Sequence, residues 1–361
     1  MPSNALDKLA QVIVRYSTGV GPGDLVTIVA EPACLDAVES IARQVLLAGG
    51  HPSFFPKSER LQRILLEAGS EHQWSHVCPF ESFRLERCDV LIVLQHPLST
   101  RAVEHADRLA QVQAARRGLM AMSMKRAAAG QMRYLLAEIP GDAAAEQAGM
   151  SPEDYARMVF DASFLDTSDP LSALRSEHER QQRLVDQLSA AKELRFRSQS
   201  GGPTDLTVHV EGGTWINASG QQNLPDGEVF TGPCGADGVV SFSVPANYRG
   251  ISMEEVRLEF RAGRVINASS TTNQDALHRL LDMDPGARMI GEIALGTNRR
   301  LTRFTNNPFL DEKIAGTFHL ALGAGYPESG NSNQSGLHWD LVHDLRTGGS
   351  VEADGRPIHW A

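Results

Sequence analysis

Histidine and carboxylate side chains recur beside turns and in short strands between Asn223 and Asp340 of the 361-residue chain. The most compact group is the sequence His338-Trp339-Asp340. Residues two apart in a strand point to the same face, so His338 and Asp340 can reach one metal ion while Trp339 packs behind them. Taken alone, such a pair is more often a structural hydrogen bond, and further ligands are needed to indicate a metal site.

Further candidate ligands lie next to apolar segments. His319 lies within the apolar run 317–323, where a satisfied core histidine is the alternative to a metal ligand. Glu228 follows a turn, and Glu292 precedes a short apolar run. Burying a lone carboxylate is costly, so each glutamate should be ion-paired, protonated or bound to a metal ion.

Together these side chains are sufficient for two divalent cations. The carboxylates and imidazoles of this region are Glu228, Glu292, Glu312, Asp340, His319 and His338. Their four negative charges exceed what a single ion requires. Two-metal sites hold their ions roughly 3.5–4 Å apart and turn a bridging water into a nucleophile near neutral pH. Oxygen and nitrogen ligands without cysteine suit Zn, Co, Mn or Mg, and they do not rank these metals.

Other catalytic motifs are incomplete in this sequence. The glycines within residues 18–23 precede a predicted strand, whereas a dinucleotide-binding loop joins a strand to a helix. The pair His178-Glu179 lacks the second histidine of an HExxH zinc motif, since Gln182 stands in its place. No Gly-x-Ser-x-Gly sequence is present, so serine hydrolase chemistry has no support.

The elements that position the candidate ligands fall into two predicted α/β domains. Residues 1–191 alternate apolar runs such as 25–30 and 89–95 with helical patterns, which predicts parallel βαβ units and a doubly wound parallel sheet. After Lys192 the pattern changes to alternating strands. We therefore expect a second α/β domain with a mixed sheet at residues 192–361, which contains all the candidate metal ligands.

Composition limits the partners and the compartment. A net charge of −10 argues against nucleic acid, whose binding depends on clustered Lys and Arg. No run approaches the length of a membrane span, and residues 1–14 contain no signal-peptide core. The four cysteines lie apart without a CxxC pair, as in reduced proteins of the cytosol. These features predict a cytoplasmic globular protein that binds neither nucleic acid nor membrane.

Several segments resemble the M29 family of metallo-aminopeptidases, the group that contains the thermophilic aminopeptidases. The similar segments, which span nearly the whole chain, are residues 47–52, 223–230, 291–296 and 319–323, Tyr326-Pro327 and residues 338–340. The resemblance implies two α/β domains, a homodimer and peptide substrates. Residues that match the family's metal ligands are Glu228, Glu292, His319, His338 and Asp340, with Tyr326 matching a tyrosine near the metals. Glu312 matches a further acid, although its spacing to His319 is longer here.

By this resemblance, the expected reaction is hydrolysis of the N-terminal residue of a peptide. Two metal ions would bind the free amine and the carbonyl oxygen and activate a water molecule. Tyr326 would donate a hydrogen bond to the developing oxyanion, or else only close the end of a strand. Glu228 is one candidate for the general base, and the sequence does not decide which glutamate acts. The loop 330–336 is shorter than in larger family members, which leaves the preferred substrate length open.

Two rival functions use part of the same residue set. His319, His338 and Asp340 form the two-histidine, one-carboxylate set of a mononuclear non-haem Fe(II) ring-cleaving dioxygenase. Dihydroxypyridine dioxygenases are similar to M29 proteins in fold, but such an iron site has no need of Glu228 or Glu292. A non-catalytic metal-binding protein on the same fold would hold metal and turn over no substrate.

Overall fold

The computed structural model describes residues 3–99, 105–248 and 250–361 and divides into two compact units. The first unit is made of Met1–Glu146, Met150–Ala173 and Gly220–Pro225. The second unit is made of Gln147–Gly149, Leu174–Ser219 and Asp226–Ala361. Neither unit is continuous in sequence, because a short segment near residue 220 belongs to the first unit although the chain on both sides of it belongs to the second.

A five-stranded parallel sheet forms the centre of the first unit. Its strands, in spatial order, are β2 (His51–Pro56), β1 (Leu25–Ala30), β3 (Val90–Gln95), β4 (Arg133–Glu138) and β8 (Asn223–Leu224). Residues Val26 to Ala30 are all buried, as expected for a strand covered on both faces. The apolar runs 25–30 and 89–95 therefore predicted two of these strands correctly.

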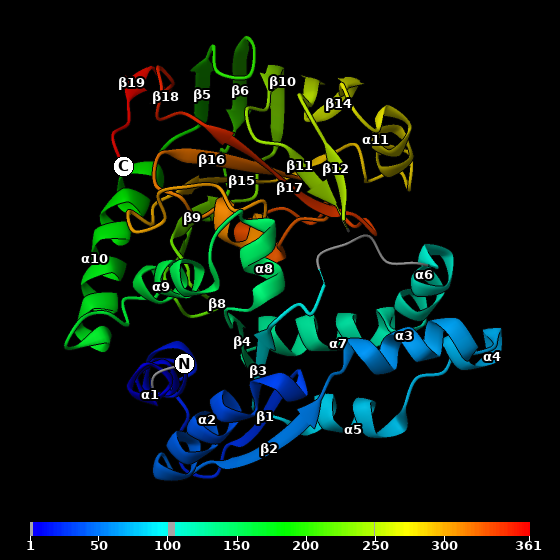
Figure 1. Cartoon of the computed structure of the whole chain (residues 1–361). Coiled ribbons are helices and arrows are strands. Elements are labelled where there is room, and N and C mark those ends of the chain that lie inside the picture. The colour runs from blue at the N-terminus through cyan, green and yellow to red at the C-terminus, as the bar shows by residue number, and fades with distance from the viewer. Residues whose placement is uncertain (1–2, 100–104, 249) are drawn as a thin grey trace. The chain divides into compact units, whose positions relative to one another are not determined.

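Helices connect and cover this parallel sheet (Figure 1). The helices of the first unit are α1 (Ser3–Gln11), α2 (Leu35–Leu47), α3 (Glu59–Ala68), α4 (Glu71–Trp74), α5 (Pro79–Arg87), α6 (Ala106–Ala115), α7 (Arg117–Ala128) and α9 (Pro152–Ala162). Helices α8 (Asp142–Gln147) and α10 (Pro170–Leu188) contain residues of both units. Helix α2 ends before Gly49, whose φ of +84° permits the left-handed turn that leads into β2.

The second unit contains two larger antiparallel sheets. The seven-stranded sheet has the order β14 (Arg264–Ser269), β13 (Arg257–Arg261), β10 (Gly235–Ser241), β6 (Thr204–His209), β5 (Glu193–Ser198), β18 (Ser350–Ala353) and β19 (Arg356–Pro357). The five-stranded sheet has the order β17 (His338–Asp344), β16 (Thr317–Gly323), β15 (Ile290–Gly296), β9 (Glu228–Thr231) and β7 (Ile216–Ala218). The remaining elements are the pair β11 (Ala246–Tyr248) and β12 (Ile251–Met253), α11 (Gln274–Leu281) and α12 (Pro308–Asp311).

One hydrophobic core joins these two sheets. It contains Phe196 and Leu206 of the seven-stranded sheet together with Ile293, Phe318 and Leu320 of the five-stranded sheet. The rings of Phe196 and Phe318 have centroids 4.3 Å apart. One face of the five-stranded sheet is therefore fixed against apolar side chains, and its other face is left for polar residues.

The parallel sheet, the antiparallel sheets and the helices confirm the predicted α/β class. Within the described ranges, no helix is both long enough and apolar enough to cross a membrane.

A buried histidine in the core of the second unit makes its stability depend on pH. His343 in β17 is fully buried, and its ring centroid lies 5.2 Å from that of Phe318 and 6.5 Å from that of Phe242. Burial lowers the pKa of His343 from 6.5 to about 4, although the Ser241 backbone and the Asp344 carboxylate act in the opposite direction. The unfolded chain takes up this proton near its ordinary pKa, whereas the folded protein does so only near the lowered one. The stability from this neutral burial is therefore complete above the ordinary pKa and is lost as pH falls towards the lowered one.

We expect His343→Phe to weaken the acid dependence of stability. Between about pH 7 and about pH 4, the wild type should lose about 3 kcal/mol more unfolding free energy than the variant. Urea unfolding followed by tryptophan fluorescence at several pH values measures this difference. The exposed His359→Phe is the matched control and should keep the wild-type dependence. Equal pH slopes for the wild type and His343→Phe would contradict the burial of a neutral imidazole.

Candidate metal centre

The candidate ligands lie on the face of the five-stranded sheet opposite its hydrophobic core. In β16, Phe318 and Leu320 belong to the core, so His319 between them points to the other face. In β17, Trp339 belongs to the core, so His338 and Asp340 on either side of it share the face of His319. The alternation of apolar and polar residues therefore places side chains from adjacent strands on a common surface.

Alanines and a bulge give the polar side chains room on this surface. Ala321 of β16 pairs with Glu292 of β15 on one side and with Asp340 of β17 on the other. His319 pairs with Ala294, whose methyl group is small. The register of β15 against β16 shifts between Ile290 and Glu292, so this bulge lets Ile290 join the core while Glu292 lies beside His319.

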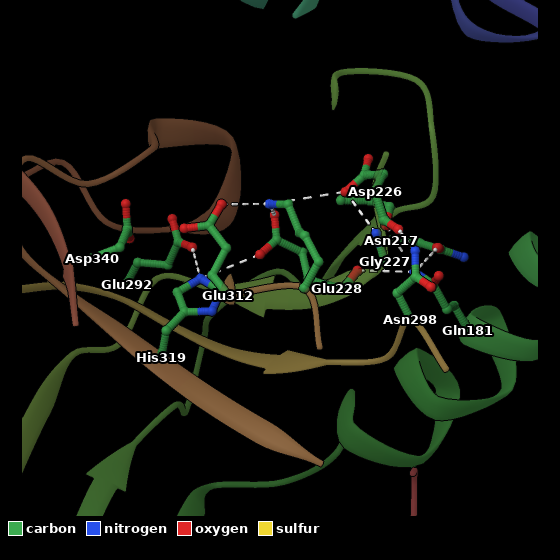
Figure 2. Close-up of polar contacts among 12 residues, drawn as sticks. Gln181, Asn217, Asp226, Gly227, Glu228, Glu292, Asn298, Glu312, His319 and Asp340 are labelled. Atoms are coloured by element: carbon green, nitrogen blue, oxygen red, sulfur yellow. Dashed lines mark hydrogen bonds and ion pairs between the residues drawn. The ribbon is translucent and has the colours of Figure 1, made fainter. Parts of the chain in front are cut away.

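His319 is at the centre of the cluster. Its Nε2 atom lies 3.2 Å from Glu228 Oε2 and 3.3 Å from Glu292 Oε1, and all three side chains are buried. Figure 2 shows the carboxylates of Glu228, Glu292 and Glu312 turned towards the imidazole of His319. The potential ligand atoms form two groups, and within each group they all lie within 4.8 Å of one another. One group is Glu228, Glu292 and His319, and the other is Glu312, His319 and Asp340.

The donor set fits a divalent cation. Among the described residues, Glu228 Oε2, Glu292 Oε2 and His319 Nδ1 have no hydrogen-bond partner, since the 3.2 Å contact of Glu228 is not aligned as a hydrogen bond. An unsatisfied buried carboxylate oxygen is strongly unfavourable unless a cation compensates it. Carboxylate oxygen together with imidazole nitrogen is a common ligand set for Zn and similar metals.

Burial and mutual charge perturb the protonation of the cluster. Burial raises the pKa of Glu228 to about 8 despite the opposing charges of Lys313 and His319, and it raises that of Asp340 to about 6. Burial alone lowers the pKa of His319, but the hydrogen bond to Glu292 and the charge of Glu228 together raise it to about 10. Ligands must lose their protons to bind a cation, so metal binding here releases protons and is favoured by higher pH.

His338 and Tyr326 lie at the side of the cluster formed by β17. The Nδ1–H of His338 donates to the Ala324 carbonyl at 2.9 Å, an arrangement that fixes the ring and leaves Nε2 as the potential ligand atom. That Nε2 lies 3.6 Å from Asp340 Oδ2. The Tyr326 ring has its centroid 5.3 Å from that of His338. The structure thus places both residues beside the cluster, although His338 belongs to neither group of closely spaced ligand atoms.

Lys313 is a buried residue of this centre that was not predicted from the sequence. Its side chain is 1% exposed, and its Nζ atom lies 2.5 Å from Glu228 Oε1, 2.7 Å from Glu312 Oε1 and 3.9 Å from Asp226 Oδ1. Lys313 follows the short helix α12, which is fixed because Asp311 Oδ1 accepts from both the backbone N–H and the hydroxyl of Thr305. The available signal was the direct neighbour Glu312, because a lysine beside a candidate metal ligand is a potential ion-pair partner.

A second missed residue, Gln181 of α10, supports the strand that carries Glu228. Its Nε2 donates to Asn217 Oδ1 at 3.0 Å, to the Ala218 carbonyl at 2.9 Å and to the Glu228 carbonyl at 3.0 Å. Gln181 therefore ties β7 to β9 from the helix (Figure 2).

The turn before Glu228 requires a glycine. Gly227 has a φ of +141°, and a Cβ at this position would lie 2.6 Å from the Cβ of Asn298. Asn298 Nδ2 in turn donates to the Asp226 carbonyl at 2.7 Å. This close approach fixes the backbone from which the Glu228 side chain extends (Figure 2).

Known proteins are similar to this chain in sequence and in fold. Aminopeptidase 2 of Geobacillus stearothermophilus is 28% identical over 375 aligned positions, in an alignment that covers 94% of this chain and 90% of that protein. Aminopeptidase T of Thermus thermophilus is 31% identical over 218 aligned positions, in an alignment that covers 55% of this chain and 52% of that protein. The solved structure of wild-type AmpT from Thermus thermophilus matches with a TM-score of 0.85 at 22% identity, covering 99% of this chain and 98% of that one. The structural match shows a common fold.

A family-level comparison covers almost the entire sequence. Residues 3–358 match the family described as thermophilic metalloprotease (M29). This range covers nearly all of both units and includes every candidate ligand on the five-stranded sheet. The resemblance seen in the sequence is thereby confirmed, and the chain belongs to the M29 family of metalloproteases.

Proposed function

We propose that this M29 metallopeptidase is an aminopeptidase that removes N-terminal residues from peptides. The observation that carries the proposal is the buried group of Glu228, Glu292 and His319, in which two carboxylate oxygens face the cluster without a hydrogen-bond partner among the described residues. The similarity to Aminopeptidase 2 over most of both chains supports the same activity. An excess of carboxylates also suits a substrate that presents a free, positively charged amino terminus.

The proposed ligands are the six residues named from the sequence, and the proposed cofactor is divalent metal. A divalent ion bound here would supply a Lewis acid for the peptide carbonyl and would lower the pKa of a water molecule. The ligands are Glu228, Glu292, Glu312, His319, His338 and Asp340. The sequence predicts two ions chosen from Zn, Co, Mn and Mg, and both the number and the identity stay predictions.

The chain itself supplies the groups that handle protons and developing charge. Glu228 is one candidate for the general base and could accept a proton only at Oε2, because Lys313 holds Oε1; where Oε2 binds the metal ion, another glutamate takes this role. Tyr326 lies beside His338 and is the proposed donor to the oxyanion of the tetrahedral intermediate. The Ala324 carbonyl orients His338 and so keeps one of its ring nitrogens directed at the site.

The geometry does not favour the mononuclear iron dioxygenase. That function would use His319, His338 and Asp340 and leave two glutamates without a role. Instead, Glu228 and Glu292 are the carboxylates that contact His319, whereas His338 lies outside both groups of closely spaced ligand atoms. The predicted homodimer and cytoplasmic location stay predictions.

The first expected result is metal-restored aminopeptidase activity. Protein stripped with a chelator should release little p-nitroaniline from leucine p-nitroanilide, and adding Zn, Co, Mn or Mg should raise the rate about a hundredfold or more. A substrate with an acetylated amino group should remain uncleaved. Failure of every metal on both this substrate and short peptides would refute the proposed activity.

Glu292→Gln should remove both metal and activity. The amide keeps the size of the side chain but loses the charge next to His319, so kcat/KM should fall at least about a hundredfold with lower metal occupancy. Metal analysis of dialysed protein and the p-nitroanilide assay measure the two effects. The exposed Glu193→Gln in β5 serves as the control and should match the wild type. Full activity in Glu292→Gln would exclude Glu292 as a ligand.

Tyr326→Phe separates a catalytic role from a structural one. If the hydroxyl donates to the oxyanion, kcat should fall by about 10–10²-fold while KM and metal content stay unchanged. Steady-state kinetics at full metal loading decides between the two roles. An unchanged kcat would mean that the Tyr326 hydroxyl does not act on the oxyanion and that the residue is structural, as its ring contacts with Phe230 and His338 suggest.

A further inference from the structure

Lys313 places a cation of the chain itself inside the proposed metal centre. Its ammonium lies between Glu228 Oε1 at 2.5 Å and Glu312 Oε1 at 2.7 Å. The side chain is 1% exposed, so solvent does not screen these contacts. Two of the four carboxylates that the sequence assigned to metal ions are therefore joined by a lysine.

The position of this ammonium excludes a metal ion bound to the same two oxygens. Carboxylate oxygens bind Zn at about 2.0–2.2 Å. An ion at that distance from both Glu228 Oε1 and Glu312 Oε1, on the side where Lys313 Nζ lies, would overlap Nζ, which is within 2.7 Å of each oxygen. One location between the two carboxylates can thus hold either the ammonium or a metal ion.

The atoms that remain suit one ion. Glu228 Oε2 and Glu292 Oε2 have no hydrogen-bond partner among the described residues, and His319 Nε2 lies within 3.3 Å of both glutamates. The second group of potential ligand atoms, with Glu312 and Asp340, needs the same histidine. Each imidazole nitrogen serves one ion, and Glu312 Oε1 already binds Lys313, so Asp340 and the other oxygen of Glu312 are left to the second group once the first ion holds His319.

We infer that the Lys313 ammonium takes the place of one of the two divalent cations, so that the centre holds a single tightly bound metal ion. This inference rests on the ligand set of the proposed function. With one ion, the four ligand carboxylates exceed the positive charge of metal and lysine by one, and the buried Asp226, 3.9 Å from Lys313 Nζ, adds a second negative charge. This excess of negative charge is complementary to an α-ammonium group, and Lys313 thereby acts as a positioning residue for Glu228 and Glu312.

Metal stoichiometry of the full-length wild type is the primary test. Chelator-stripped protein is equilibrated with Zn at several free concentrations, and the bound ions per chain are measured by mass spectrometry and by isothermal titration. The expected result is saturation at one ion per chain. Saturation at two ions of similar affinity would overturn the inference.

The variant Lys313→Met tests the cause. Methionine keeps much of the side-chain volume and removes the charge, so Glu228 Oε1 and Glu312 Oε1 become available and a second ion should bind at least about tenfold more tightly than to the wild type. The exposed Lys192→Met is the matched control and should still bind one ion. A folded Lys313→Met protein that stays at one ion would also overturn the inference. If Lys313→Met does not fold, Lys313→Gln replaces it: a second bound ion in this variant, with one ion in the wild type, would support the inference, and one ion in a folded Lys313→Gln would overturn it.

These readouts are separate from the aminopeptidase assay. A chain that binds one Zn and cleaves no peptide would refute the proposed activity and leave the role of Lys313 supported. A chain that binds two Zn ions and cleaves peptides would support the proposed activity and refute the inferred role of Lys313.

Discussion

The cost of burying carboxylates in the second unit governs the rest of this structure. Glu228 and Glu292 are nearly inaccessible to solvent, yet neither oxygen pair is fully satisfied by the described residues. Moving an ionised carboxylate from water into a protein costs several kcal/mol even after relaxation. Lys313 offsets part of that cost at Glu228 Oε1. Glu228 Oε2 and Glu292 Oε2 have no hydrogen-bond partner among the described residues, and a bound cation would compensate their buried charge.

The hydrophobic core supplies the rigidity that such a cluster requires. Phe318, Leu320 and Trp339 anchor β16 and β17 against the seven-stranded sheet, and the ligands of these two strands, His319, His338 and Asp340, stand next to the anchored positions. Ligands that extend from paired strands are held more accurately than ligands on loops. Two of the residues involved in the ion-pair network, Glu312 and Lys313, come from the segment after α12, and hydrogen bonds of Asp311 fix that segment.

Features that depend on neighbouring residues, such as strands and the faces of their side chains, could be predicted from the sequence. The strand 25–30 was predicted with its observed bounds because its apolar run is continuous, and the common face of His338 and Asp340 follows from the period of a strand. Lys313 and Gln181 were missed because their partners are remote: Lys313 contacts Glu228 across 85 residues, and Gln181 does so across 47. A lysine or glutamine on a polar segment gives no sign of such contacts until the fold brings them together.

The candidate ligands differ in how much of each side chain is exposed, and this difference indicates the side from which a substrate would reach the cluster. The side chains of Glu228, Glu292 and His319 are at most 7% exposed, whereas those of His338 and Asp340 are 30% and 22% exposed. β17 is also the first strand in the order of the sheet, so its residues lie at an edge. Solvent and substrate therefore meet His338 and Asp340 before they meet the buried glutamates. Tyr326 packs against His338 on that same side, which places its phenol next to the accessible ligands. A peptide amino terminus entering there would approach the carboxylate-rich interior directly, and the buried Lys313 would lie behind the carboxylates, bound to Glu228 and Glu312.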